Sequence, residues 1–301
     1  MLSRLINQFR VYRSILDHPL NRGRRAAATR RWLLWHLSSR LAPGPIAVPF
    51  VDHTALLAGP GMSGLTTNIY CGLAELPDMG FVLHALRPAD LFLDVGANAG
   101  VYTVLASGVV GARSIAIEPL PATFGVLQRN LALNGLSASA QALNAAVGEH
   151  PGTVRFTTRW DTTNHVLAPG EQAEHCEVPL VTLDDALAGQ DATLIKIDIE
   201  GYEMPALRGA RRLLDAPTLK AVVIELNHSG DRYGFDDRDT AGLLSRHGFV
   251  PVSYDPLHRL LLRRDGTDGD GNNTIFVRDP DAMQALLRAA PARRIANGPI
   301  L

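Results

Sequence analysis

The stretch "LIKIDIEGYE" at residues 194–203 places charged side chains inside an otherwise apolar run. Leucine and isoleucine recur through it, which predicts a buried strand over residues 193–199. Side chains alternate between the two faces of a strand, so Lys196, Asp198 and Glu200 share one face. Burying an isolated charge is costly, and Lys196 is therefore expected to pair with an acid of this row. Capping the next helix needs only one acid, so we interpret the row as a functional site.

A second candidate site is the glycine-rich stretch "DVGANAG", residues 94–100, which follows an apolar run and precedes a helical pattern. Gly96 and Gly100 permit a tight turn and a close approach of the backbone to a ligand. Glu118 ends the next apolar run, where an acid can accept hydrogen bonds from a ribose diol. The G-x-G-x-x-G pattern of nicotinamide dinucleotide sites is incomplete here, and Asp94 would repel a pyrophosphate. Asp94 suits an ammonium group instead, such as the amino-acid end of S-adenosylmethionine. The structural alternative is a turn that needs glycine for backbone reasons.

Strand-like and helical stretches alternate between residues 91 and 278, and these elements must position both sites. We expect strands at 91–95, 113–118, 137–148, 193–199, 220–227, 249–254 and 272–278, and extended inserts at 152–158 and 176–183. Helical patterns follow most of the strands, which predicts an α/β fold with a mostly parallel sheet and helices on both faces. The last two strands, close together in the chain, indicate an antiparallel edge. The Gly- and Asp-rich stretch 263–273 between them lacks the spacing of a calcium-binding loop, so we expect a plain hairpin loop.

The composition excludes several classes of protein. With 301 residues and 46% hydrophobic content, the chain can bury the core of one large domain plus an extension. A net charge of −1 argues against a nucleic-acid partner. Two cysteines are too few for a zinc site or a disulfide framework. No apolar run approaches the roughly 20 residues of a membrane span, so we expect a cytoplasmic protein.

The first 45 residues are unlike the rest of the chain. They contain nine arginines and a single acid, Asp17, which gives a local charge of +8. Their pattern is helical, with Leu5, Phe9, Tyr12 and Leu16 on one face. Such a basic helix could make peripheral contact with an anionic membrane surface. The alternative is a helix that packs on its own domain or in a dimer, and the oligomeric state stays open.

Five stretches occur in an order that resembles one known family. They are "LFLDVGANAGVYTVLAS", "AIEPLPATFGVLQRNLALNG", "VTLDDAL", "LIKIDIEGYEMPALRGARRLL" and "VVIELN". Together they are similar to the FkbM family of S-adenosylmethionine-dependent methyltransferases over about residues 75–280, with Glu75 matching an acid before the first strand. The resemblance implies a Rossmann-like methyltransferase fold with a seven-stranded sheet, and methylation of hydroxyls on glycans or secondary metabolites. It also implies a cofactor site that comprises Asp94, Gly96, Asn98, Gly100, Glu118 and, near the adenine, Asn144.

These patterns divide the chain into three parts. Residues 1–75 form a basic helical and β lead-in extension, with residues 46–75 rich in hairpins. We expect residues 76–280 to form the Rossmann-like methyltransferase domain that the resemblance implies, and residues 281–301 to form a C-terminal helical tail. Nothing from the resemblance transfers to residues 1–60.

Methyl transfer to an alcohol requires that the hydroxyl be held in line with the methyl group and lose its proton. The catalytic candidates are Asp198, Glu200, Lys196 and His228, with Asp198 or His228 as the base. Alternatively, Asp198 with Glu225 and Asn227 could bind Mg²⁺. We favour acid–base chemistry without a metal, because no second acid follows Glu225 closely. His228 could instead be an ordinary solvated histidine.

The sequence therefore predicts an enzyme that methylates an oxygen of a small molecule or glycan with a free hydroxyl. Two alternatives remain, a nicotinamide-dependent oxidoreductase and a non-catalytic protein that binds a nucleoside cofactor on the same fold. The missing glycines weigh against the first alternative, and the intact charged row weighs against the second. No motif identifies the acceptor.

Overall fold

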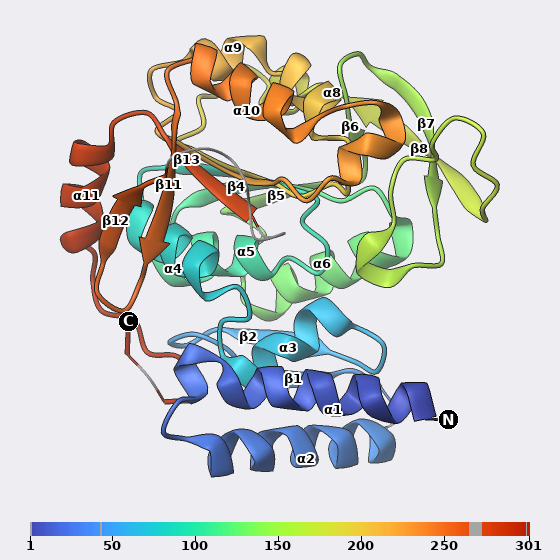
Figure 1. The fold of residues 1–301 in the computed structure, drawn as a ribbon, viewed down its shortest axis with the longest axis vertical. Coiled ribbons are helices and arrows are strands. Elements are labelled where there is room, and N and C mark those ends of the chain that lie inside the picture. Colours follow the sequence, from blue (N-terminus) through green and yellow to red (C-terminus); the bar gives the residue numbers. More distant parts are fainter. Residues whose placement is uncertain (1, 43, 265–272, 299) are drawn as a thin grey trace.

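A sheet of eight strands forms the centre of the molecule in the computed structural model, which describes residues 2–42, 44–264, 273–298 and 300–301 (Figure 1). Its strands are β3 (Leu91–Val95), β4 (Arg113–Ile117), β5 (Ala140–Leu143), β9 (Leu194–Ile197), β10 (Ala221–Glu225), β11 (Val250–Asp255), β12 (Leu260–Arg263) and β13 (Asn273–Val277). Their order in the sheet is β12-β11-β13-β10-β9-β3-β4-β5. Neighbours from β5 to β10 run parallel, whereas β13 is antiparallel to both β10 and β11. The mostly parallel sheet and its antiparallel edge are confirmed.

The eighth strand, β12, is the difference from the seven-stranded expectation. It pairs with β11 alone and is largely exposed. An edge strand with little burial lacks the alternation of apolar and polar residues that reveals a strand in sequence. The hairpin loop expected at 263–273 falls mostly on residues 265–272, which lie outside the described part of the chain.

Helices cover both faces of the sheet. On one face lie α4 (Leu76–Ala85), α5 (Val101–Thr103) with the π-helix η2 (Val104–Val110), and α6 (Pro121–Leu133); on the other lie α8 (Glu203–Arg208), α9 (Arg211–Asp215) and α10 (Asp237–Arg246) (Figure 1). Phe92 and Leu194 belong to the core of the first face, and Leu93 and Ile195 to that of the second. Two residues after Leu194, Lys196 therefore also points to the α4–α5 face, in keeping with strand alternation.

A small three-stranded sheet is inserted after β5. It consists of β6 (Ala146–Val147), β7 (Gly152–Thr157) and β8 (His175–Val181), in the order β6-β8-β7. The short helix η3 (Asp161–Thr163) lies between β7 and β8, and α7 (Leu183–Ala186) leads back to the main sheet. The extended inserts expected from the sequence are thus confirmed.

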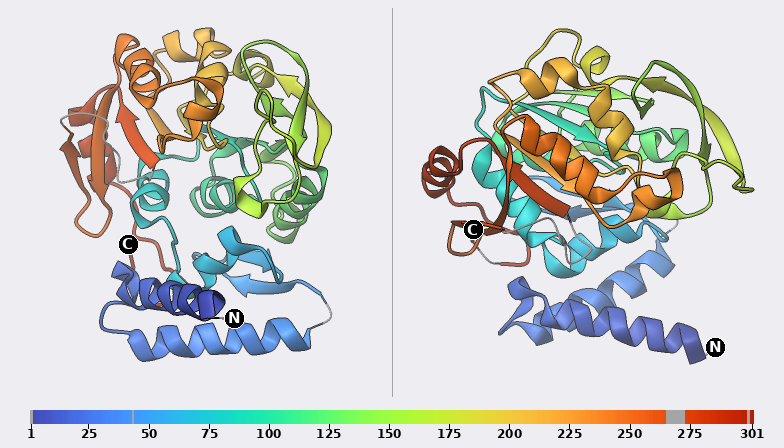
Figure 2. Two further views of the ribbon diagram at one scale, coloured as in Figure 1. Left: turned by 45° about the vertical axis from the view of Figure 1, so that its right-hand side comes forward. Right: turned by 45° about the horizontal axis from the view of Figure 1, so that its top comes forward.

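The N-terminal residues form a separate layer beyond helices α4–α6 (Figures 1 and 2). The layer consists of α1 (Leu2–Asp17), η1 (Pro19–Asn21), α2 (Arg25–Leu41), the hairpin of β1 (Ile46–Pro49) and β2 (Ala55–Ala58), and α3 (Ser63–Cys71). Helix α1 packs on α2, where the Tyr12 hydroxyl lies 2.7 Å from the Thr29 hydroxyl. The hairpin was expected, but α3 was not, because glycines at 61, 64 and 72 resemble turn signals.

The C-terminal residues bind the N-terminal layer to the rest of the molecule. Only the first part of the expected helical tail is helical, as α11 (Pro280–Arg288). Beyond it, Ile295 pairs with Val51 beside the β1–β2 hairpin, and the Asn297 side chain donates to the Cys71 carbonyl at 2.7 Å. Pro291 follows the end of α11 closely, at a place where proline cannot continue a helix.

Candidate active site

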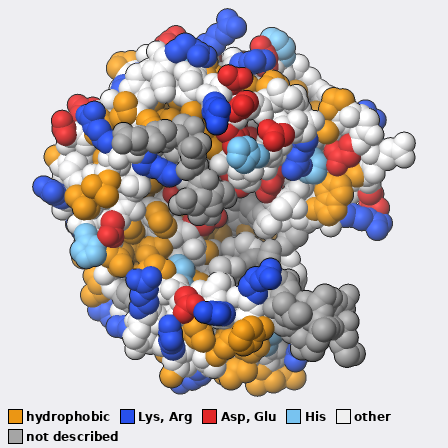
Figure 3. Space-filling view, viewed as in Figure 1, with side chains coloured by type: hydrophobic (Ala, Val, Ile, Leu, Met, Phe, Trp, Pro, Cys, Tyr) orange, Lys and Arg blue, Asp and Glu red, His pale blue; other side chains and the backbone are white. Residues whose placement is uncertain are grey.

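A cavity of about 390 Å³ opens where the parallel strands β3, β4, β9 and β10 end. Ligands of open α/β sheets bind at this edge. The N-terminal layer and the β7–β8 insert close the cavity from the sides, since Thr67 and Asn68 of α3 and Phe156 and Asn164 of the insert line it. Figure 3 shows the molecular surface hollowed between the upper body and the N-terminal layer.

The glycine loop after β3 forms the floor of the cavity. Gly96 and Gly100 both have left-handed φ angles, 76° and 83°. A Cβ atom on Gly96 would lie 1.9 Å from the Asp198 carbonyl oxygen, and one on Gly100 would lie 2.5 Å from Leu127 Cδ1. Glycine suits both positions because it tolerates these φ angles and has no Cβ atom. At Gly96, the missing side chain lets the loop lie directly against the residues that follow β9.

Asp94 has the features of a ligand-binding acid. Its side chain is 1% exposed, and Oδ2 accepts a hydrogen bond of 2.6 Å from the Thr103 hydroxyl. Its Oδ1 is buried and has no hydrogen-bond partner, although the residue lines the cavity. Burial raises the pKa of Asp94, while Lys196 opposes that change. A buried acceptor without a partner calls for a water, an ion or a ligand to satisfy it, and an ammonium group is suited to this one.

Glu118 lies on the opposite side of the glycine loop, at the end of β4. Its carboxylate accepts hydrogen bonds from the backbone N–H groups of Asn98 at 3.0 Å and Leu120 at 2.9 Å. Burial raises its pKa to about 7. Asn144 stands behind this acid and donates to the carbonyl oxygens of Glu118 and Pro119, both at 2.8 Å. It does not belong to the described residues that line the cavity.

The charged row at the end of β9 forms the opposite wall. Lys196 is 3% exposed, and its Nζ lies 2.7 Å from Asp198 Oδ2, so the expected pairing is confirmed. The ammonium group also lies 4.7 Å from the centre of the Tyr102 ring, and the Tyr102 hydroxyl donates to Glu75. Burial alone would lower the pKa of Lys196, but the carboxylates of Asp198, Glu75 and Asp94 outweigh it and raise that pKa.

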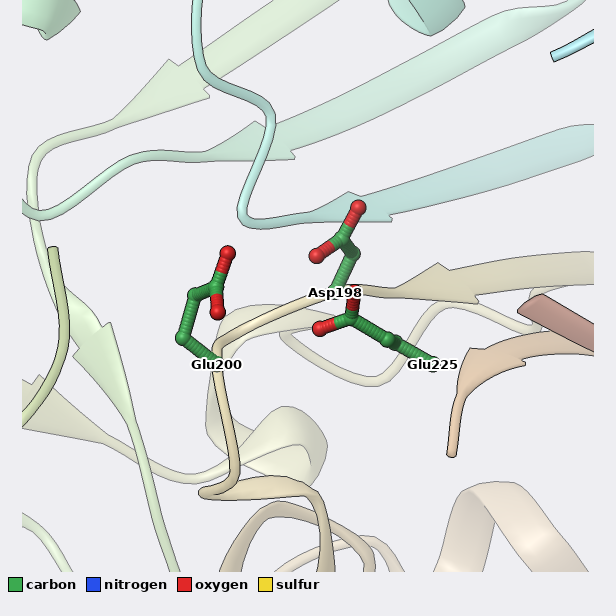
Figure 4. A group of neighbouring side chains, drawn as sticks. All are labelled: Asp198, Glu200 and Glu225. Atoms are coloured by element: carbon green, nitrogen blue, oxygen red, sulfur yellow. The ribbon is translucent and has the colours of Figure 1, made fainter. Parts of the chain in front are cut away.

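Three carboxyl groups meet in front of Lys196. Oxygen atoms of Asp198, Glu200 and Glu225 lie within 4.8 Å of one another (Figure 4). Burial and the neighbouring Asp198 raise the pKa of Glu200 to about 7 and that of Glu225 to about 9. One Glu225 oxygen is buried without a hydrogen-bond partner. Such a group of acids holds a shared proton or a cation, because three negative charges at this spacing repel one another.

Two neighbours of this group differ from expectation. In the alternative Mg²⁺ site, Asn227 would join Asp198 and Glu225. Its side chain instead accepts hydrogen bonds from the backbone and hydroxyl groups of Ser229, and Glu200 lies with the two acids. Glu203, the acid in the first turn of α8, does more than favour the start of that helix. It is 6% exposed and accepts hydrogen bonds from the backbone N–H groups of Ile199 and Gly201. It thus fixes the loop that carries Glu200.

The structure does not bring His228 to the other candidates. It has a left-handed φ of 66°, its side chain is 80% exposed, and its ring lies 3.7 Å from Asp237. It is absent from the described residues that line the cavity. His165 of the β7–β8 insert is also absent from the described residues that line the cavity. It is buried, and its ring stacks on that of Trp160 with the ring centres 5.2 Å apart.

The N-terminal layer and α4 supply cavity residues that local patterns did not reveal. These are Gly64, Leu65, Thr67 and Asn68 of α3, Glu75 before α4, and Met79 of α4. The resemblance pointed to Glu75 alone, and nothing in the sequence of residues 63–71 distinguishes them from a surface segment.

Comparison with known proteins supports the sequence resemblance. The family described as "Methyltransferase FkbM domain" matches residues 94–251, more than half of the chain. The chain is 27% identical over 221 residues to 31-O-demethyl-FK506 methyltransferase FkbM of Streptomyces tacrolimicus, covering 60% of this chain and 82% of that protein. It is 28% identical over 179 residues to hexuronic acid methyltransferase AglP of Haloferax volcanii, covering 54% and 65% respectively. With Methyltransferase 1 of Beauveria bassiana the identity is 32% over 148 residues, covering 40% and 59%. The chain thus spans less than two thirds of the last two relatives.

Solved structures give similarities of lower identity. A methyltransferase FkbM of Methylobacillus flagellatus is 20% identical with a TM-score of 0.45, and the match covers 71% of this chain and 52% of that one. TrmK of M. capricolum, solved with S-adenosylhomocysteine, is 8% identical with a TM-score of 0.39, and the match covers 66% of both chains.

Proposed function

Because this chain belongs to the FkbM methyltransferase family, we propose that it transfers the methyl group of S-adenosylmethionine to a hydroxyl oxygen of a sugar or secondary metabolite. The chain is a methyltransferase and its cofactor is S-adenosylmethionine, as in its family; the nicotinamide alternative is not favoured. The acceptor class rests on two relatives, whose names give a demethylated FK506 and a hexuronic acid as their acceptors.

One observation supports the proposal most strongly, namely that Asp94, Glu118 and the Asp198 group line a single cavity. S-adenosylmethionine carries two positive groups, a sulfonium and an ammonium. The cavity wall contains six carboxyl groups and one lysine. This excess of acid complements a cationic ligand and opposes a pyrophosphate.

We assign the cofactor-binding roles to the glycine-loop side. The unpartnered Oδ1 of Asp94 would receive the ammonium group, and Glu118 would receive the ribose hydroxyls. Gly96, Asn98 and Gly100 let the backbone approach the ligand closely. Asn144 acts indirectly, by holding the carbonyl groups that follow β4.

The acceptor side would orient and deprotonate a hydroxyl group. S-adenosylmethionine supplies an electrophilic methyl group, so the protein has to position the oxygen and remove its proton. Lys196 holds Asp198 in one orientation, and Asp198 in turn would hold the hydroxyl. Glu200 suits the role of proton acceptor, since a pKa of about 7 leaves it partly ionised at neutral pH.

A divalent cation is the second candidate for the acceptor side. The three carboxylate oxygens of Asp198, Glu200 and Glu225 are the ligand type that Mg²⁺ prefers. A bound cation would keep all three acids ionised and could bind the acceptor oxygen. Treatment with a chelator decides between the two: activity that survives supports the acid–base assignment, and activity lost and then restored by Mg²⁺ supports the cation.

The proposal is tested with the purified chain and isotopically labelled S-adenosylmethionine. Calorimetry should show binding of S-adenosylmethionine and S-adenosylhomocysteine but not of NADH. A panel of uronic acids, neutral sugars and hydroxylated macrolides should then yield at least one product with the label on oxygen. Binding of NADH alone, or label recovered only on nitrogen or carbon, would contradict the proposal.

A further inference from the structure

The outer face of α2 carries a stripe of exposed leucines. Leu33, Leu34, Leu37 and Leu41 are 49–75% exposed. Residues 33, 37 and 41 recur every four positions, so these side chains share one face of the helix with Leu34 beside them. We call these four residues the leucine face.

The opposite face of α2 already packs on the rest of the chain. Ala28 and Trp35 are buried in the main core, and Trp32 contacts Tyr12 of α1 with the ring centres 5.3 Å apart. Packing against the rest of the protein therefore buries only the inner side of this helix. An exposed stripe of large apolar side chains on a surface helix is typical of an interaction surface.

Two exposed arginines of α2 lie beside the leucine face. Arg30 lies on the same side of α2, one turn before Leu34, and Arg40 lies at its edge; both are exposed. Five further arginines of the N-terminal layer are exposed, on α1, in the segment before α2 and at the first residue of α2: Arg10, Arg13, Arg22, Arg24 and Arg25. Two of them, Arg13 and Arg25, form ion pairs with Asp17. Residues 1–45 carry +8, so the remaining chain carries −9 for a total of −1. Figure 3 shows hydrophobic and basic side chains next to each other over the N-terminal layer.

An apolar groove opens beside the leucine face. Its volume is about 270 Å³, and it runs between α2, β1 and α3. Its walls include Leu34, Trp35, Val48 and Ile69, with the Arg31 guanidinium at one side. Leu34 belongs both to the groove and to the leucine face, so the two apolar surfaces are continuous.

We propose that the leucine face and its arginines dock this protein peripherally on an anionic lipid bilayer. The leucines would enter the boundary between headgroups and acyl chains, and the arginines would contact lipid phosphates. An acyl chain is the apolar ligand that fits the adjoining groove. The helix lies on the bilayer and does not cross it, because no helix among the described residues is long and apolar enough to span a membrane. This proposal does not depend on the proposed function.

Charge favours lipid over a second copy of the chain. A two-fold symmetric dimer through this face would place two segments of +8 opposite each other. Like charges across an interface oppose association, whereas an anionic headgroup layer complements them. The leucines alone would suit either partner, and the arginines distinguish the two.

Co-sedimentation of the full chain with vesicles tests the proposal. Vesicles of phosphatidylglycerol and phosphatidylcholine should bind the protein, those of phosphatidylcholine alone should bind it much less, and added salt should weaken the binding. Replacing Leu33 and Leu37 by Gln should lower the partition coefficient by roughly tenfold or more. Replacing Arg30 and Arg40 by Gln should lower it by roughly fivefold per residue.

Two matched controls keep the test specific. Leu257→Gln changes a leucine of similar exposure, 49%, in the β11–β12 turn, and Arg238→Gln changes an exposed arginine on α10. Both should bind vesicles like the unchanged protein, and all variants should keep their melting temperature and affinity for S-adenosylmethionine. The proposal is overturned if anionic vesicles do not bind at low salt, or if the leucine variant binds undiminished. It is also overturned if that variant instead disrupts a dimer that has no affinity for vesicles.

Discussion

The two sides of the cavity satisfy their buried acids in different ways. On the glycine-loop side, Glu118 receives backbone N–H groups from Asn98 and Leu120. On the β9–β10 side, Glu200 and Glu225 lie against each other and against Asp198, and one Glu225 oxygen has no partner. The glycine-loop side also contains an acceptor without a partner, Asp94 Oδ1, but hydrogen bonds hold each of its two acids in place. The β9–β10 side instead brings three acids together, and a proton, a hydroxyl group or a cation must satisfy them.

This difference separates binding from chemistry. A carboxylate held by backbone groups keeps its position and presents a fixed acceptor, which suits a cofactor that is bound again in every cycle. Burial and the neighbouring Asp198 raise the pKa of Glu200 to about 7, so this crowded carboxyl group can exchange a proton near neutral pH. Changes on the first side should therefore affect affinity, and changes on the second should affect turnover.

Asp198→Asn tests this comparison with the largest expected effect. The variant keeps the shape of the side chain but removes the charge that orients the acceptor hydroxyl. Turnover should fall by about 10²-fold or more in single-turnover measurements, because a misplaced acceptor oxygen lowers the rate by about that much. Affinity for S-adenosylmethionine should change by less than about threefold, because the residues assigned to it lie on the other side.

Asp239→Asn is the matched control for that experiment, since Asp239 is exposed on α10. Its turnover and melting temperature should stay unchanged. If Asp198→Asn melts at a lower temperature but is fully active, then the ion pair with Lys196 only stabilises the fold, and Asp198 takes no part in methyl transfer.

Local sequence patterns predicted the parts of the site that depend on a single element. The glycine loop and the Lys196–Asp198 pair follow from a strand alternation and from glycines at a turn, and both lie where expected. Contacts between distant segments were not predictable in this way. Glu225 meets Glu200 only because β10 lies next to β9, and α3 reaches the cavity only through packing of the N-terminal layer.

The position of the His228 side chain was not predictable from the strand pattern. Sequence places it just after β10, at the correct edge of the sheet, but a left-handed backbone turn at this residue leaves its side chain in solvent. Position along a strand predicts the edge at which a residue lies. The direction of a side chain beyond the strand end depends on the turn that follows, and no pattern in "NHSGD" specified that turn.

Glu118→Gln tests whether Glu118 binds the ribose, and it should lower the affinity for S-adenosylmethionine. Gln retains an oxygen for one backbone N–H group but loses the charge that would attract the ribose hydroxyls. Affinity for S-adenosylmethionine should fall by roughly tenfold to a hundredfold in calorimetry, the equivalent of about 1.5–3 kcal/mol for a hydrogen bond to a charged group. The rate of the chemical step at saturating cofactor should be nearly unchanged. Glu177→Gln, an exposed acid on β8, is the control, and equal affinities for the two variants would refute the assignment.

Glu200→Gln tests whether Glu200 accepts the proton, through the pH dependence of the single-turnover rate. A base with a pKa of about 7 acts in its ionised form, so the single-turnover rate should rise with pH up to about 7 and level off above it. The variant should be at least tenfold slower at pH 8 and should lose that rise. If the variant keeps the same pH profile, another group takes the proton.

Glu203→Gln has the smallest expected effect on activity and tests whether a buried acid behind the site is structural. Burial raises its pKa to about 7 from the ordinary 4.5, although the backbone N–H groups of Ile199 and Gly201 oppose this. The folded protein therefore binds a proton more readily than the unfolded chain between about pH 4.5 and 7, and stability from this group falls as pH rises through that window and stays level above it. Gln keeps the acceptor oxygen but does not titrate, so the variant should lack this pH-dependent loss. Between pH 5 and pH 8, the free energy of unfolding of the unchanged protein should therefore fall by up to about 3 kcal/mol more than that of the variant. Denaturant unfolding at the two pH values measures this, and turnover should stay within about twofold.

A loss of turnover as large as that of Asp198→Asn would place Glu203 among the catalytic groups. The acids that shape the site could then no longer be distinguished from those that act in it.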